Sequence, residues 1–67
     1  MQIVKGNRIA FDSADNRVRG TVTYVGSYYF YLTLETTFTT CATWKPGESK
    51  MFTFNSITNL KQLKPKP

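Results

Sequence analysis

The residues best suited to chemistry in this chain are cations and aromatic rings on two neighbouring predicted strands. Arg17 and Arg19 share one face of the segment at residues 17–25, and Tyr29 and Tyr31 share one face of the segment at residues 28–35. Arginine can fork onto a phosphate, and an exposed tyrosine ring can stack on a nucleobase. This spacing predicts a basic-aromatic strand face that binds nucleic acid.

A second group of candidate binding residues surrounds the Pro46-Gly47 turn. Lys45 and Lys50 flank this turn, and Trp44 precedes it. Two placements of the single tryptophan stay open: it belongs to the core, as large aromatic residues of small domains usually do, or it lies exposed in the binding site. Three further lysines near the carboxyl terminus would add a flexible basic arm; they are Lys61, Lys64 and Lys66.

Enzymatic chemistry finds little support in the sequence. The chain has no histidine, which removes the commonest general base and every Ser–His or Cys–His pair. We therefore predict a protein that is not an enzyme, with no catalytic residues, no metal site and no cofactor. Cys41 has no basic neighbour and no second cysteine, so we expect a small buried hydrophobic residue there.

Net charge and size indicate the class of partner. Nine Lys and Arg against four Asp and Glu give a charge of +5, which favours DNA or RNA, or an acidic protein partner. The 67 residues form one domain, which buries only about 60% of its unfolded surface. A homodimer would supply additional burial. The alternative function is thus a protein-interaction or self-associating module without nucleic-acid contact.

The location of the protein is predicted from what the sequence lacks. No long apolar run is present, so we expect no membrane span. Residues 1–5 turn polar at once, unlike a signal peptide. A lone cysteine suits a reducing compartment, and these features together predict a cytoplasmic protein.

Alternation of apolar and polar residues predicts an all-β fold of five to six short antiparallel strands. The predicted strands are residues 8–12, 17–25, 28–35 and 50–55, with an extended segment at residues 36–44. Turns are expected at residues 13–16, at Gly26-Ser27 and at residues 45–49, and a single 3₁₀ turn at residues 56–59. Gly20 marks a bend inside its strand, and a bulge near Tyr24 would return Val25 to the interior.

The phase of these strands predicts the core and the limits of the domain. Residues 1–63 form a small β-barrel whose closure removes exposed strand edges, and residues 64–67 form a basic flexible tail. The expected core consists of the apolar residues that share the inward face: Ile9, Phe11, Val22, Phe30, Leu32, Leu34, Phe52, Phe54, Leu60 and Leu63.

This pattern resembles the Src-homology-3-like small barrels, particularly the KOW and Tudor modules. The resemblance lies in G-N-R-I-A-F at residues 6–11, G-T-V-T-Y-V at residues 20–25, Y-F-Y-L-T-L at residues 29–34 and F-N-S-I-T-N-L-K-Q-L at residues 54–63. It is a likeness of architecture that covers most of the chain.

The resemblance implies a binding module, since KOW and Tudor relatives bind nucleic acid, ribosomal components, RNA polymerase partners or modified side chains. Polyproline binding is not expected, because the loop at residues 13–16 is short. An oligonucleotide-binding barrel is an alternative architecture, although the K-G-F-G-F-I and V-F-V-H-F stacking motifs of cold-shock proteins are absent.

Overall fold

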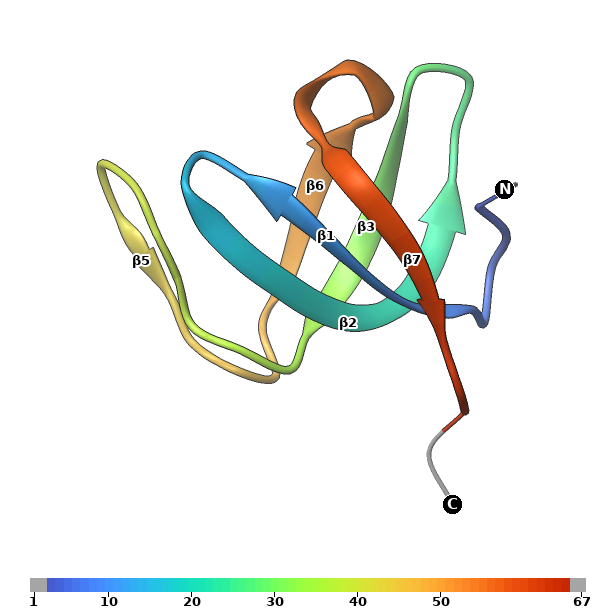
Figure 1. The fold of residues 1–67 in the computed structure, drawn as a ribbon, viewed down its shortest axis with the longest axis horizontal. Helices are drawn as coiled ribbons and strands as arrows, with labels where there is room; N and C mark the ends of the chain where they lie inside the picture. Colours follow the sequence, from blue (N-terminus) through green and yellow to red (C-terminus); the bar gives the residue numbers. More distant parts are fainter. Residues whose placement is uncertain (1–2, 66–67) are drawn as a thin grey trace.

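The computed structural model describes residues 3–65 and shows an all-β chain, as predicted. Its elements are β1 (Arg8–Ser13), β2 (Asn16–Val25), β3 (Tyr29–Leu34), β4 (Phe38–Thr39), β5 (Thr43–Trp44), β6 (Ser49–Thr53), the 3₁₀ helix η1 (Phe54–Ser56) and β7 (Thr58–Leu63). Five strands form an antiparallel sheet in the order β6-β3-β2-β1-β7, and β4 and β5 pair separately (Figure 1).

Strand β2 is shared between the two halves of the sheet and bends between them. Its first residues pair with β1, from Asn16 opposite Ser13 to Thr21 opposite Arg8. Its last residues pair with β3, from Gly20 opposite Leu34 to Val25 opposite Phe30. The long strand curves visibly in Figure 1. One half of the sheet is therefore β7-β1-β2, and the other is β2-β3-β6.

Gly20 permits this bend, as the sequence predicted. A Cβ atom at Gly20 would lie 2.3 Å from the backbone oxygen of Thr33 and 2.7 Å from Cγ of Leu32. Only glycine fits where two backbones approach this closely. The predicted bulge is also present, because the β2–β3 register shifts between Val22 and Tyr24. It leaves Tyr24 exposed and brings Val25 against the core.

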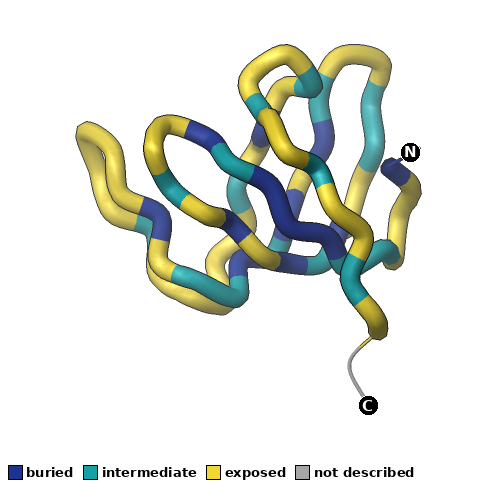
Figure 2. The backbone as a smooth tube through the Cα atoms, viewed as in Figure 1, coloured by how far each residue is buried: buried dark blue, intermediate teal, exposed yellow. Residues whose placement is uncertain are grey.

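The core lies between the inner faces of the two half-sheets. Phe11 of β1 makes edge contacts with Phe30 of β3 and Phe52 of β6, at centroid distances of 5.8 and 5.0 Å. Figure 2 shows a continuous buried stretch in β1 and shorter buried segments in β2, β3 and β6. The hydrophobic core cluster comprises Ile3, Ile9, Phe11, Val18, Val22, Phe30, Leu32, Leu34, Phe38 and Phe52.

The predicted core is confirmed for seven of its ten residues and corrected for three. Phe54, Leu60 and Leu63 are half-buried, and the first two pack on the rim of the core. The sheet is open, in contrast to the predicted closed barrel, because β6 and β7 each pair on one side only within the described chain. Phe54 and Leu60 are therefore only half-buried, whereas Leu63 lies opposite Arg8 on the outer face of the sheet, so its predicted phase is wrong.

Two local predictions are corrected by the structure. Residues 36–44 form a hairpin instead of one extended segment, since Phe38 pairs with Trp44 and the amide of Thr40 donates to the carbonyl of Ala42. The 3₁₀ helix begins at Phe54, earlier than predicted, and the Phe54 ring lies 5.5 Å from that of Phe30. The chain is then extended again as β7, which pairs with β1.

Two further predictions concern a membrane span and the carboxyl-terminal tail. No helix in residues 3–65 is long and apolar enough to cross a membrane. The predicted tail at residues 64–67 falls partly on Lys66 and Pro67, which lie outside the described residues.

Candidate nucleic-acid interface

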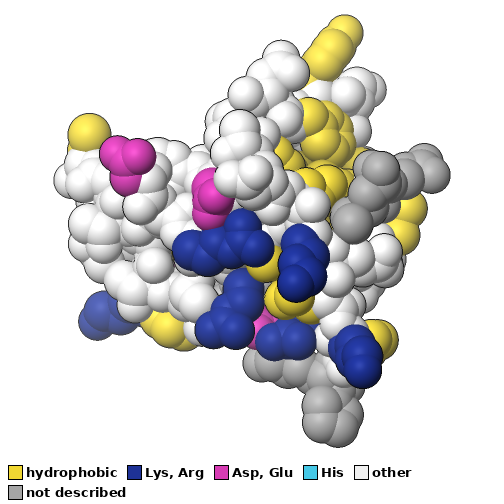
Figure 3. Space-filling model, viewed as in Figure 1, with side chains coloured by type: hydrophobic (Ala, Val, Ile, Leu, Met, Phe, Trp, Pro, Cys, Tyr) yellow, Lys and Arg dark blue, Asp and Glu magenta, His cyan; other side chains and the backbone are white. Residues whose placement is uncertain are grey.

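Positive side chains gather on the outer face of the β7-β1-β2 half-sheet, as Figure 3 shows. At its centre Ala10 of β1 lies opposite Arg19 of β2 on one side and Lys61 of β7 on the other. Ala10 is only 2% exposed, because the longer neighbouring side chains shield it. The basic face is defined here as Arg8, Arg17, Arg19, Lys61 and Lys64.

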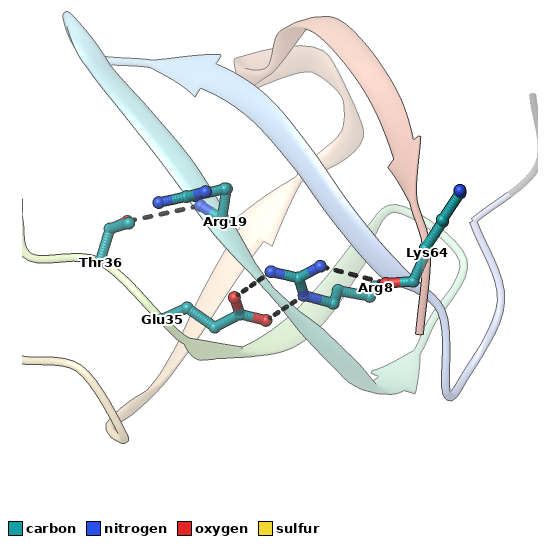
Figure 4. A network of polar contacts seen from close by, with 5 residues as sticks. All are labelled: Arg8, Arg19, Glu35, Thr36 and Lys64. Atoms are coloured by element: carbon teal, nitrogen blue, oxygen red, sulfur yellow. Dashed lines mark hydrogen bonds and ion pairs between the residues drawn. The ribbon is translucent and has the colours of Figure 1, made fainter. Parts of the chain in front are cut away.

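Arg8 is the structural member of the basic face. Its guanidinium forms a two-pronged ion pair with Glu35, with Nε to Oε2 and Nη2 to Oε1 both at 2.8 Å (Figure 4). Nη1 also donates to the carbonyl of Lys64 at 3.1 Å. The hydrogen bond to Glu35 raises the pKa of Arg8 above its ordinary value. Arg8 therefore joins β1 to the residues that follow β3 and β7, and its charge is largely compensated.

Arg17 is partly compensated but remains accessible. Its Nη1 lies 3.2 Å from Oδ1 of Asp12 and 3.3 Å from the carbonyl oxygen of Asn59. Asn59 Nδ2 donates to Oδ2 of Asp12 at 2.7 Å, and this bond, followed by the one from Arg17, lowers the pKa of Asp12. Exposed pairs of this kind contribute about 0–1 kcal/mol, so Arg17 can exchange its carboxylate for a phosphate at little cost.

Three cations of the basic face carry uncompensated charge. The side chains of Arg19, Lys61 and Lys64 form no hydrogen bond or ion pair with any other residue in the range 3–65. All three are exposed. Arg19 is fixed through its backbone instead, since its amide donates to Oγ1 of Thr36 (Figure 4) and its carbonyl accepts from the amide of Glu35. These three side chains can bind an anion without first breaking an internal contact.

Tyr29 and Tyr31 lie elsewhere, in a cluster with Tyr24. The three ring centroids are 6.0–6.1 Å apart. The Tyr29 ring also covers Gly26, where a Cβ atom would lie 2.9 Å from Cε1 of the ring. The neighbouring Tyr24 is the main cause that raises the pKa of Tyr29. This cluster belongs to the outer face of the β2-β3-β6 half-sheet.

The predicted single basic-aromatic patch is therefore divided between opposite sides of the molecule. The inner faces of the two half-sheets pack on each other through Phe11 and Phe52, so their outer faces point in opposite directions. Arg17 and Arg19 lie on one, and Tyr29 and Tyr31 on the other. The bend in β2 causes this division, because it turns the two ends of one strand toward different sides.

Trp44 and Lys50 form a third, separate arrangement. Lys50 lies opposite Leu32 and faces inward, with Nζ 4.6 Å from the Trp44 ring centroid, 4.7 Å from Phe52 and 5.1 Å from Phe38. Trp44 is half-buried against Phe38 at the rim of the core. Lys50 thus makes cation–π contacts within its own chain, away from the basic face.

Lys45 and Cys41 are exposed and lie outside the basic face. Lys45 begins the predicted type II turn, in which Gly47 has a φ of +93° and the amide of Glu48 donates to the Lys45 carbonyl. Cys41 is exposed, so the prediction of a buried residue is wrong. It lies in the turn of the β4–β5 hairpin, which projects away from the main sheet in Figure 1.

Sequence reasoning missed Arg8 and Tyr24 as surface neighbours of the candidate residues and treated Lys61 as part of a flexible arm. The outward position of Arg8 could have been predicted, since Arg8 alternates with Ile9 and Phe11 in the first predicted strand. The position of Lys61 could not, because the pairing of β7 with β1 joins distant parts of the chain.

Metal-ligand clusters and apolar grooves are the other kinds of site for which the described surface gives observations. Among residues 3–65, no three His, Cys, Asp or Glu side chains gather as metal ligands would. An apolar groove of about 520 Å³ opens beside η1, lined by Ile3, Val25, Phe54, Ile57 and Leu60 among others. Neither observation bears on the cations of the basic face.

Comparisons with known proteins found no matching family model, no similar curated protein and no similar solved structure. The functional assignment accordingly rests on the geometry of the two sheet faces.

Proposed function

We propose that this chain is a non-enzymatic nucleic-acid-binding protein whose basic face contacts the phosphate backbone. The observation that supports this proposal is the row formed by Arg19, Ala10 and Lys61 across three strands. Two uncompensated cations flank a buried alanine, and no exposed carboxylate lies between them. A row of cations on a regular sheet surface suits a row of phosphates.

The composition of the basic face favours binding that does not depend on base sequence. None of its five members is aromatic, and the tyrosines lie on the opposite side. Phosphate contacts set position and affinity but carry no sequence information. We therefore expect similar affinities for unrelated sequences, with dissociation constants of about 1–100 µM at physiological salt.

The architecture supports the same class of function. The bent five-stranded sheet is compatible with a small barrel-like fold. The finer proposal is a Src-homology-3-like module of the KOW or Tudor type, for which the motif resemblance is the support. A cytoplasmic location, inferred from the single cysteine, belongs to this proposal as well.

The test uses three substitutions that each remove one exposed positive charge. Arg19→Ala and Lys61→Ala alter the basic face, and Lys45→Ala is the matched control in the β5–β6 turn. Binding is measured by fluorescence anisotropy with labelled duplex and single-stranded DNA and RNA at several salt concentrations. Arg19→Ala and Lys61→Ala should each weaken binding and reduce the slope of log affinity against log salt by about one, whereas Lys45→Ala should leave the slope unchanged.

Two results would contradict the proposal. The first is the absence of wild-type binding to any of these nucleic acids at low salt. The second is an equal effect of all three substitutions, which would indicate diffuse attraction by the net charge of +5 instead of a localised interface.

A further inference from the structure

Among residues 3–65, no charged side chain belongs to the outer face of the β2-β3-β6 half-sheet, although the protein has a net charge of +5. The outward residues of this face are Thr21, Thr23 and Tyr24 of β2, Tyr29, Tyr31 and Thr33 of β3, and Ser49, Met51 and Thr53 of β6. This set is called the tyrosine face below.

An exposed apolar row crosses the middle of the tyrosine face. Tyr24 lies opposite Tyr31, and Tyr31 lies opposite Met51, so the three side chains span three neighbouring strands. They are 51%, 39% and 45% exposed. Tyr28, at 80%, stands at the adjoining hairpin turn. Such a contiguous patch of tyrosine and methionine on a small domain is typical of the centre of an interaction surface.

The rings of this face are already held in place before any partner binds. Each of Tyr24, Tyr29 and Tyr31 contacts the other two, and Tyr29 also covers Gly26. The hydroxyl of Thr23 donates to the carbonyl of Tyr31 at 3.4 Å. Binding of a partner would therefore restrict few additional side-chain rotamers, which lowers the entropic cost of association.

We propose that the tyrosine face is the contact surface of a homodimer, related by a twofold axis. A twofold contact places the same surface against itself, so charged residues near its centre would meet like charges. The tyrosine face avoids this repulsion because its outward residues include no charged side chain, and the five cations of the basic face lie on the opposite side. A nucleic acid would find no cation here to neutralise its phosphates.

A twofold contact of this kind needs only a small part of the exposed surface of the chain. A weak but specific dimer buries up to about 600 Å² on each copy. That is roughly one seventh of the 4483 Å² that this chain exposes, and the face extends over three of the five strands of the sheet. Dimerisation would also supply the apolar burial that a domain of this size lacks alone. The proposal does not depend on nucleic-acid binding, because it concerns the opposite side of the molecule.

The test is sedimentation equilibrium of the full chain from micromolar to millimolar concentration. A reductant is present throughout, because the exposed Cys41 could otherwise form a disulfide between copies. Tyr31→Glu and Met51→Glu each place a negative charge in the apolar row. Ala42→Glu, in the exposed turn of the β4–β5 hairpin, introduces the same charge elsewhere. Circular dichroism verifies that each variant is folded.

The expected result is a reversible wild-type dimer whose dissociation constant rises by at least about 30-fold in Tyr31→Glu and in Met51→Glu. The Ala42→Glu variant should dimerise like the wild type. If Tyr31→Glu does not fold, the result for Met51→Glu decides. A wild type that stays monomeric at millimolar concentration overturns the proposal, and so does a dimer that both variants retain. Loss of single-strand binding in the variants of a monomeric protein would assign the face to nucleobases instead.

Discussion

At the scale of single residues, Gly20 decides how the sheet folds over its core. Its position leaves no space for a side chain, because the nearest obstacle is the Thr33 backbone oxygen, which cannot rotate away as a side chain could. Since β2 passes from one half-sheet to the other here, a change at Gly20 disturbs the pairing with both neighbours.

Gly20→Ala should therefore lower the free energy of unfolding by about 3 kcal/mol or more. A domain of this size has only about 3–5 kcal/mol of net stability, so the variant should be largely unfolded. Urea denaturation followed by circular dichroism measures the loss. Gln62→Ala, at an exposed position of β7, is the control and should change the free energy by less than about 0.5 kcal/mol. A Gly20→Ala variant with an unchanged midpoint would show that the strand does not bend there.

Asp12 makes the free energy of unfolding depend on pH in the acidic range. Hydrogen bonds from Asn59 and Arg17 lower its pKa in the folded state, so folding favours the carboxylate. The resulting stability is present above the pKa of the unfolded chain, about 4, and is lost as the pH falls through the lower folded pKa. The difference in stability between wild type and Asp12→Asn should accordingly be largest near neutral pH and shrink as the solution becomes strongly acidic.

The measurement is urea denaturation of both proteins at a series of pH values. Asn59→Gly is an informative companion, because glycine accepts the positive φ of 54° at this position while the main hydrogen-bond donor to Asp12 is removed. The free energy of unfolding of Asn59→Gly should fall less on acidification than that of the wild type. A wild-type advantage over Asp12→Asn that is the same at every pH would contradict this explanation.

At the scale of elements, the β4–β5 hairpin is the part held by the fewest contacts. It has two residues in each strand and pairs with no strand of the main sheet. Its attachments are the buried ring of Phe38, the stack of Trp44 with Lys50, and two hydrogen bonds between Asn16 and the backbone of Thr39. Lys50 also places an inward-pointing charge on the edge strand β6, a device that discourages edge-to-edge aggregation.

Trp44→Ala should loosen this hairpin and lower the free energy of unfolding by about 1–3 kcal/mol, since a half-buried ring and a cation–π contact are lost together. Lys50→Met retains the apolar part of the side chain and removes only the charge, so its cost should stay near 1 kcal/mol or below. Thermal unfolding followed by circular dichroism compares the two. Equal and negligible effects would mean that Phe38 and the Asn16 hydrogen bonds hold the hairpin without the Trp44–Lys50 contact.

The elements that could be predicted from sequence are those with one face on the core. Alternation along residues 8–12, 17–25 and 28–35 located β1, β2 and β3, because a slip by one residue would expose Phe11 or Leu32. The β4–β5 hairpin could not be located in the same way. Its turn is Thr40-Cys41-Ala42, which contains none of the glycine, proline or asparagine residues that mark turns.

Part of the candidate site was predicted, because the sequence shows which way a side chain points but not which strands are neighbours. The sequence correctly assigned outward positions to Arg17, Arg19, Tyr29 and Tyr31, since the alternation along a strand determines which side chains face solvent. Their grouping into one patch was wrong, because adjacency also depends on the bend in β2. Lys61 joins Arg19 only through a pairing between the first strand and the last. Such long-range pairing leaves no trace in local sequence.

At the scale of the whole molecule, two outer faces of different character lie on opposite sides of one core. The basic face carries three uncompensated cations, and the tyrosine face carries exposed aromatic rings and, among the described residues, no charged side chain. The protein measures 28 × 28 × 19 Å, with the shortest axis along the view of Figures 1 and 3. Because the faces are separate, both can be occupied at once, and a dimer formed through one would present two copies of the other.

The most direct measurement of the proposed interface is a nuclear magnetic resonance titration of the labelled protein with a short DNA duplex. We predict that the amide signals of β1, of the first half of β2 and of β7 shift, with Arg19 and Lys61 among the most affected. The signals of Tyr24, Tyr31 and Met51 should stay in place. Shifts centred on the tyrosine face, or no shifts at low salt, would contradict the proposal that the basic face binds nucleic acid.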